Sequence, residues 1–137
     1  MDNDRVKHSI SVARRMVEIG KSYNLSNKEL EELFVLGLNH DIGYEFCDGS
    51  DHNVVGGNIL KRSNYKYWRE VYYHGVVQEE YSSLYLKILN TADMQVDKYG
   101  NVVGFEERLK DIKSRHGEDS VVYKRCVLLI EFITSEV

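Results

Sequence analysis

Residues 30–43 read LEELFVLGLNHDIG, an amphipathic segment that ends in a His-Asp pair and a glycine. Just before it, residues 26–29 (Ser-Asn-Lys-Glu) have the spacing of a capping box, which satisfies the first free N–H groups of a helix. The apolar residues that follow recur at helical spacing and form one stripe. The stretch therefore predicts a helix that carries His40-Asp41 at its end, followed by a turn at Gly43. The stripe consists of Leu30, Leu33, Phe34, Gly37 and Leu38.

Similar helical patterns lie on both sides of this segment. The chain of 137 residues has no proline to interrupt helices and ten glycines available to end them. No repeat, low-complexity segment or linker divides it. We therefore predict an all-α fold, a single bundle of six or seven helices over residues 1–137. The other predicted helices cover 4–21, 51–62, 67–74, from a serine cap at 82 or 83 to 93, 105–115 and 120–132, with a loop at 45–51 and a turn at 97–101.

Composition and charge narrow the classes of function. Eighteen basic and twenty-two acidic residues give a net charge of −4, which argues against a nucleic-acid partner, because such binding needs a basic face. The longest apolar runs are too short to cross a membrane, and no signal pattern opens the chain. Cys47 and Cys126 lie far apart, with no second cysteine near either one, and we interpret them as two reduced thiols. We expect a cytoplasmic protein with no membrane contact, whose apolar last helix either completes the core or forms a homodimer contact.

Four metal-binding side chains lie where their helices become apolar: His8, His40, Asp41 and Asp93. Asp93 shares a helix face with two leucines, where an unpaired carboxylate costs several kcal/mol or takes up a proton. A divalent cation removes that cost, since carboxylates and neutral imidazoles bind it. Each residue taken alone also has an ordinary explanation, such as a histidine packed in the core or an aspartate paired with an arginine. The ordered set on successive helices is what favours a metal site.

This set resembles the HD-domain superfamily of metal-dependent phosphohydrolases over about residues 5–100, and the resemblance implies that residues 1–137 form a single HD-domain-like helical bundle. The leading helix carries His8, residues 40–43 reproduce the His-Asp-Ile-Gly motif of the HDIG subgroup, and residues 91–93 (Thr-Ala-Asp) match the closing aspartate. His52 and His74 look like the extra histidines of subgroups that hold two metals. Bacterial HD-type hydrolases of diadenosine tetraphosphate show a similar pattern. Those enzymes tend to carry a lysine shortly after His-Asp, and residues 42–45 contain none.

The resemblance implies a particular division of the ligands. A first divalent cation would be held by His8, His40, Asp41 and Asp93, and a second by His52 and His74, with Asp41 bridging both. Asp41, His52 and His74 would then serve catalysis, in which a metal-bound hydroxide attacks phosphorus. Mixed imidazole and oxygen ligands favour iron or manganese and leave other transition metals and magnesium open. The implied substrate is a small phosphorylated molecule, with a nucleotide favoured.

Other features leave alternatives open. Arg15 and Lys98 are candidate contacts for a substrate phosphate, or ordinary surface charges. The aromatic residues between 65 and 73 would stack on a base or pack in the core. The domain would instead be a non-catalytic nucleotide-binding regulatory HD domain if its ligands were degenerate, but all six positions are filled. The same ligands also suit a di-iron HD-type oxygenase, which oxygen-dependent turnover would distinguish from a hydrolase.

Overall fold

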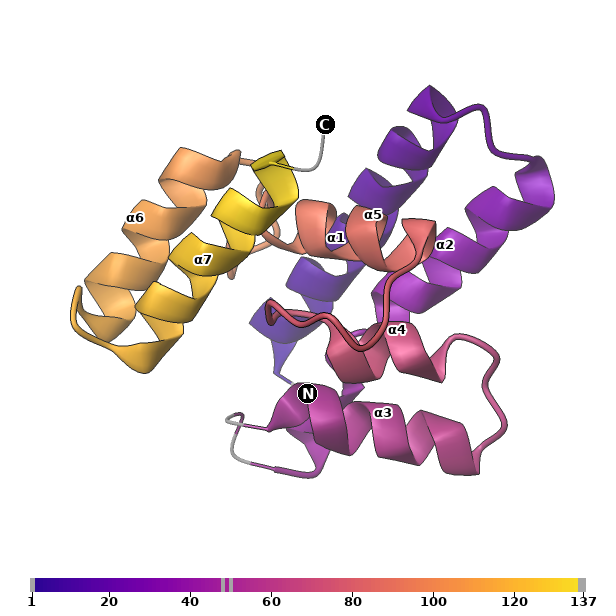
Figure 1. Cartoon of the computed structure of the whole chain (residues 1–137), viewed down its shortest axis with the longest axis horizontal. Helices are drawn as coiled ribbons and strands as arrows, with labels where there is room; N and C mark the ends of the chain where they lie inside the picture. The colour runs from indigo at the N-terminus through magenta and orange to yellow at the C-terminus, as the bar shows by residue number, and fades with distance from the viewer. Residues whose placement is uncertain (1, 48, 50, 136–137) are drawn as a thin grey trace.

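The computed structural model describes residues 2–47, 49 and 51–135. Within these residues the chain forms seven α-helices, and its only β contact is an isolated bridge between Val96 and Val102, which confirms the predicted all-α fold. No helix in this part of the chain is both long and apolar enough to cross a bilayer. The elements are α1 (Asn3–Ser22), α2 (Asn27–Asn39), the 3-10 helix η1 (Ile42–Glu45), α3 (His52–Arg62), α4 (Trp68–Tyr73), α5 (Leu84–Asp93), α6 (Phe105–His116) and α7 (Val121–Ser135) (Figure 1).

The helix starts follow local capping chemistry. The Ser26 hydroxyl accepts a hydrogen bond from the Glu29 N–H at 3.2 Å, and the Glu29 carboxylate accepts one from the Ser26 N–H at 3.0 Å, so the predicted capping box is present. At α5 the cap is Ser83, whose hydroxyl accepts from the Leu86 N–H at 3.0 Å. The turn predicted at Gly43 is η1, which extends into the first residue of the predicted 45–51 loop. Positions 48 and 50 of that loop lie outside the described residues.

The main core lies between α1, α2 and α5, against which α3 and α4 pack from one side (Figure 1). Three aromatic side chains, Tyr65, Tyr67 and Trp68, pack against this core. The Tyr67 hydroxyl also donates to Glu32 at 2.6 Å. For these three residues the structure shows core packing, the second of the two roles left open by the sequence. The most buried members of the core are Val12, Met16, Leu33, Leu36, Val71, Ile88, Leu89, Ala92 and Val96.

Helices α6 and α7 form a hairpin at the left of Figure 1, whereas α3 and α4 lie at the bottom of this view. A second apolar cluster joins this hairpin to the end of α5, where Met94 contacts buried side chains of α7. The last helix therefore completes the core, and it runs on to Ser135 because Ile133 is also buried there. Whether a second copy of the chain contacts it stays a prediction.

The close crossing of α1 and α2 depends on Gly37. A Cβ atom at this position would lie 2.5 Å from Ala13 Cα and 2.9 Å from the Ala13 N atom, both backbone atoms that cannot rotate away. On an open helix face, Gly→Ala stabilises a helix by about 1 kcal/mol. Here we expect Gly37→Ala to lower the free energy of unfolding by about 1–3 kcal/mol, the usual cost of overpacking.

Chemical denaturation would measure this effect. Glu31→Ala, on the exposed side of α2, is the matched control and should change stability by less than about 0.5 kcal/mol. A Gly37→Ala protein as stable as the wild type would show that the two helices have room to separate.

Candidate metal centre

Five helices bring all six predicted ligands together at one place in the fold. Five of the ligands lie at or next to a helix end, and His8 lies within α1. Their side chains are largely buried: those of His40 and His74 are 0% exposed, and that of His52, the most exposed, is 22% exposed. The positions are His8 in α1, His40 and Asp41 directly after α2, His52 at the start of α3, His74 directly after α4, and Asp93 at the end of α5.

Each of the four histidines is oriented by a backbone carbonyl that faces its Nδ1 atom. A carbonyl oxygen only accepts hydrogen bonds, so we assign the proton to Nδ1, and in the neutral ring Nε2 then keeps its lone pair. All four Nε2 atoms are thereby available as ligands, the arrangement typical of histidines that bind metals. The Nδ1 bonds are His8 to Asp97 O at 2.9 Å, His40 to Gly37 O at 2.7 Å, His52 to Gly49 O at 2.9 Å and His74 to Val71 O at 2.6 Å.

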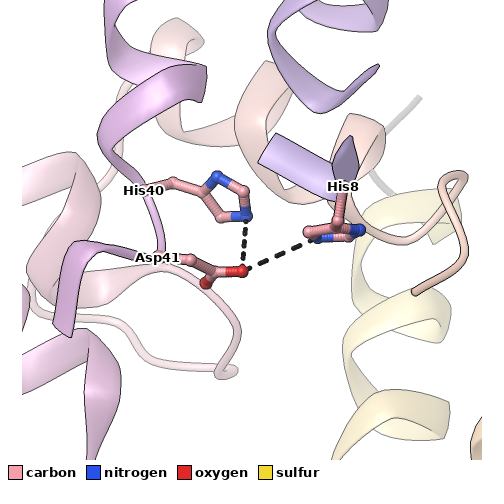
Figure 2. A group of neighbouring side chains, drawn as sticks. All are labelled: His8, His40 and Asp41. Atoms are coloured by element: carbon pink, nitrogen blue, oxygen red, sulfur yellow. Dashed lines mark ion pairs between the residues drawn. The ribbon is translucent and has the colours of Figure 1, made fainter. Parts of the chain in front are cut away.

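The Asp41 carboxylate divides these histidines into two pairs. Its Oδ2 atom lies 3.2 Å from His40 Nε2 and 3.7 Å from His8 Nε2, the two contacts drawn in Figure 2. Its Oδ1 atom lies 3.3 Å from His52 Nε2 and 3.5 Å from His74 Nε2. Asp93 is closest to the first pair, with its Oδ1 atom 2.9 Å from His8 Nε2 and 3.4 Å from His40 Nε2. The two oxygens of Asp41 thus face two different pairs of histidines.

Several of the Nε2 atoms lack a suitable hydrogen-bond partner unless a positive charge lies between them. His40 Nε2 is buried and has no hydrogen-bond partner in suitable geometry among the described residues. The Nε2 atoms of His52 and His74 face one another at 3.3 Å, so two neutral rings would bring lone pair against lone pair. Three overlapping sets of these residues each have ligand atoms within 4.8 Å of one another. The imidazole and carboxylate donors, and their spacing, therefore fit divalent transition-metal ions.

The charge balance of the centre points the same way. Burial by itself raises the pKa of the Asp41 and Asp93 carboxyls, but the adjacent histidines, above all His40, outweigh it and hold both pKa values well below their ordinary range. Burial likewise lowers the pKa of His40, but the two carboxylates outweigh it and raise that pKa well above its ordinary value. The two carboxylates thus attract positive charge, which a proton on His40 would supply in part and which bound cations would supply in its place.

The glycine of the His-Asp-Ile-Gly motif brings the two halves of the centre together. A Cβ atom at Gly43 would lie 1.9 Å from the His52 carbonyl oxygen, so only glycine lets η1 approach the start of α3 this closely. The next residue, Tyr44, stacks on the His52 ring with centroids 4.3 Å apart. The Arg5 guanidinium lies 3.5 Å from the Tyr44 ring centroid. Sequence reasoning missed Tyr44 and Arg5, although Tyr44 occupies the segment where the related hydrolases tend to have lysine.

A cavity of about 490 Å³ opens onto the centre, and Lys98 lies in its wall. Arg15 does not line this cavity: its Nε donates to Gln95 at 2.9 Å and its Nη1 lies 3.4 Å from Glu18. The structure gives no support to a phosphate role for Arg15, which stays a prediction. None of the aromatic residues between 65 and 73 lines the cavity either. Three arginines of the α6–α7 hairpin do line it, and sequence reasoning missed them: Arg108, Arg115 and Arg125.

Fold and centre together define a helical domain with a buried four-histidine, two-aspartate site suited to metal ions. The family model described as HD domain matches residues 5–127, so this chain belongs to the HD domain family, whose members are largely metal-dependent hydrolases. The match extends past the stretch that carries the motifs and includes α6 and the first part of α7. Searches of curated proteins and of solved structures gave no match.

Proposed function

We propose that this protein is a metal-dependent phosphohydrolase that cleaves a phosphoester or phosphoanhydride bond in a small substrate, with a nucleotide favoured. The observation that carries the proposal is the division of the four histidines by the two oxygens of Asp41. In this proposal His8, His40, Asp93 and Asp41 hold one divalent cation, and His52, His74 and Asp41 hold a second. Iron or manganese suits these donors best, and other transition metals and magnesium stay open.

Two adjacent divalent cations, when bound, supply the acidity that ionises water at neutral pH and the positive charge that neutralises phosphoryl oxygens. The chain's own residues prepare the place for this chemistry. The carbonyls at Nδ1 hold the four rings in position, so little reorganisation is needed when a substrate arrives. The second group of ligands has only three members, which leaves room there for water and substrate. The partly exposed His52 places that opening on the cavity side of the centre.

Several finer features belong to the same proposal. The cavity of about 490 Å³ has a volume in the range of small-ligand sites and is large enough for a nucleotide. Lys98, in its wall, is a candidate contact for the substrate phosphate. We place the chain in the HDIG subgroup on its motif, and we propose a cytoplasmic enzyme whose partner is a soluble substrate rather than a nucleic acid or a membrane.

Metal analysis followed by a hydrolysis screen tests this function. Protein purified without chelator should contain about two ions of iron or manganese per chain, as counted by elemental analysis. The loaded protein should release inorganic phosphate, or a shorter phosphorylated product, from at least one member of a panel of nucleotides and phosphate esters. Chelator should abolish the activity, and added manganese should restore it.

The other outcomes favour the alternative functions. A chain that stays free of metal after reconstitution would contradict the proposal and favour a regulatory domain. Oxygen consumption that depends on an iron pair, with no hydrolysis of any phosphorylated compound, would favour a di-iron oxygenase.

A further inference from the structure

The part of the cavity wall formed by α6 and α7 is strongly basic, although the chain as a whole has a net charge of −4. Helices α6 and α7 supply three arginines to this wall, and the turn after α5 supplies Lys98. The aspartates that line the cavity outside the metal centre, Asp2 and Asp4, belong to the chain's N-terminal end, where Asp2 pairs with Arg5. The α6–α7 wall therefore carries a concentration of positive charge that the proposed metal chemistry does not use.

Arg108 lies next to the metal centre and is held in place. Its side chain is only 11% exposed, its Nε donates to the Asp93 carbonyl oxygen at 3.4 Å, and its Nη1 lies 3.4 Å from Asp111 Oδ2. No described residue accepts a hydrogen bond from its Nη2 group. This guanidinium thus lies against the backbone of a candidate metal ligand, lines the cavity and still has a donor group without a described partner.

Arg115 and Arg125 are the other two arginines of this wall. Arg115 binds Asp111 through two contacts, Nε to Oδ1 at 3.3 Å and Nη2 to Oδ2 at 3.0 Å, which fix the plane of its guanidinium. Asp111 is thus the shared partner of two arginines, and one carboxylate neutralises only one of their charges. Arg125 forms no ion pair with any residue that the structure describes. The three arginines therefore keep a net charge of about two.

From this arrangement we infer that the α6–α7 hairpin is a second anion-binding site, which holds a phosphate group of the substrate other than the one being cleaved. The inference rests on the proposed function and specifies its substrate class: a molecule with at least two phosphate groups, such as a nucleoside polyphosphate or a bisphosphate. Arginine is suited to this task because its planar fork donates paired hydrogen bonds to phosphate oxygens. Arg108, Arg115 and Arg125 are then specificity-determining residues, which bind the substrate at a distance from the reacting phosphorus.

Phosphonates that cannot be hydrolysed test this inference by binding alone. Titration calorimetry at constant ionic strength would compare propane-1,3-bisphosphonate, with two anionic phosphorus groups, and propylphosphonate, with one, on the manganese-loaded protein. We expect the bisphosphonate to bind at least about tenfold more tightly, since one charge-assisted hydrogen bond is worth about that much. A third probe, 4-phosphonobutanoate, has the same spacing but a carboxylate as its second anion, and should bind more weakly than the bisphosphonate.

Variants assign the effect to the hairpin. Arg115→Gln and Arg125→Gln should each weaken bisphosphonate binding by about five- to tenfold and change propylphosphonate binding by less than twofold. Lys110→Gln is the matched control, because it removes one positive charge from the same α6 helix at a side chain that is 67% exposed and lies outside the cavity wall. It should leave both affinities within about twofold of the wild type. Arg125, on the exposed side of α7, can be replaced without disturbing the core.

The results separate this inference from the proposed function. Equal binding of the one-anion and two-anion probes, or equal losses in the arginine and lysine variants, would overturn the second anion site even if the protein hydrolyses phosphate esters. Equal affinity for the bisphosphonate and 4-phosphonobutanoate would overturn the assignment to phosphate. A bisphosphonate preference that the arginine variants abolish would support the site, even if the hydrolysis screen found no substrate.

Discussion

Asp41→Ala is expected to leave the protein without bound metal and without hydrolytic activity. Both oxygens of this carboxylate face histidine Nε2 atoms, and each oxygen faces a different pair, so in the proposed centre the substitution removes a ligand of both cations at once. Replacing an outer partner of a metal ligand already costs about 10–100-fold in metal affinity. We expect removal of the shared ligand itself to cost more than that at each site, and elemental analysis of the purified variant would measure it.

Two further variants make the Asp41 result interpretable. Asp41→Asn keeps the size of the side chain but loses its charge, so it should also lose metal while preserving the shape of the centre. Asp119→Ala removes an exposed carboxylate that does not line the cavity and should keep the full metal content. Far-ultraviolet circular dichroism would check that each variant is folded. Full metal content in folded Asp41→Ala protein would remove Asp41 from the centre.

His52→Ala and His74→Ala are expected to lower the metal content from about two ions per chain to about one. The Nε2 atoms of both histidines face Asp41 Oδ1. Those of His8 and His40 face Asp41 Oδ2 and the Asp93 carboxylate instead. His52→Ala is the more specific test of the two, because the His74 ligand atom also lies within 4.8 Å of those of His40 and Asp93. The partly exposed position of His52 also makes its substitution the less disruptive one for folding.

The fifth histidine of the chain provides the control for these two variants. His116 lines the cavity at the end of α6 but belongs to none of the metal-binding groups among the described residues. His116→Ala should therefore retain about two ions per chain. If neither His52→Ala nor His74→Ala changes the metal content, the centre holds a single ion, and these histidines are structural or bind substrate.

The helices of this protein were predictable from the sequence because their signals are local. The capping box at Ser26 and the apolar stripe of α2 act within one or two helical turns, and the structure has both. Boundaries that depend on packing were less accurate: α7 continues beyond residue 132 because Ile133 is buried against a distant cluster. The same limit applied to the aromatic residues near Trp68. The sequence left base stacking and core packing as alternatives for them, and the fold shows Tyr65, Tyr67 and Trp68 packed on the core.

Four of the candidate ligands stood out locally, because a charged or imidazole side chain on an apolar helix face needs a partner wherever the fold places it, whereas His52 and His74 became candidates through the family resemblance. Asp93 and His40 show this most clearly. Charged residues on polar faces give no such signal. Arg15 and Arg108 are equally ordinary in the sequence, but one pairs with Gln95 and Glu18 outside the cavity, whereas the other lies against the Asp93 backbone inside it.

The sequence by itself thus determined the all-α class and the helices, since both depend on neighbours within a few positions along the chain, and its resemblance to the HD-domain superfamily singled out the six candidate metal ligands. Only the tertiary structure decided how the candidate ligands are grouped around the two oxygens of Asp41. The facing of Asp41 toward two pairs of histidines and the basic wall from α6 and α7 depend on how helices far apart in the sequence pack. Packing depends on side-chain volume, as in the space left by Gly37 and Gly43, and residue order alone does not specify the resulting distances.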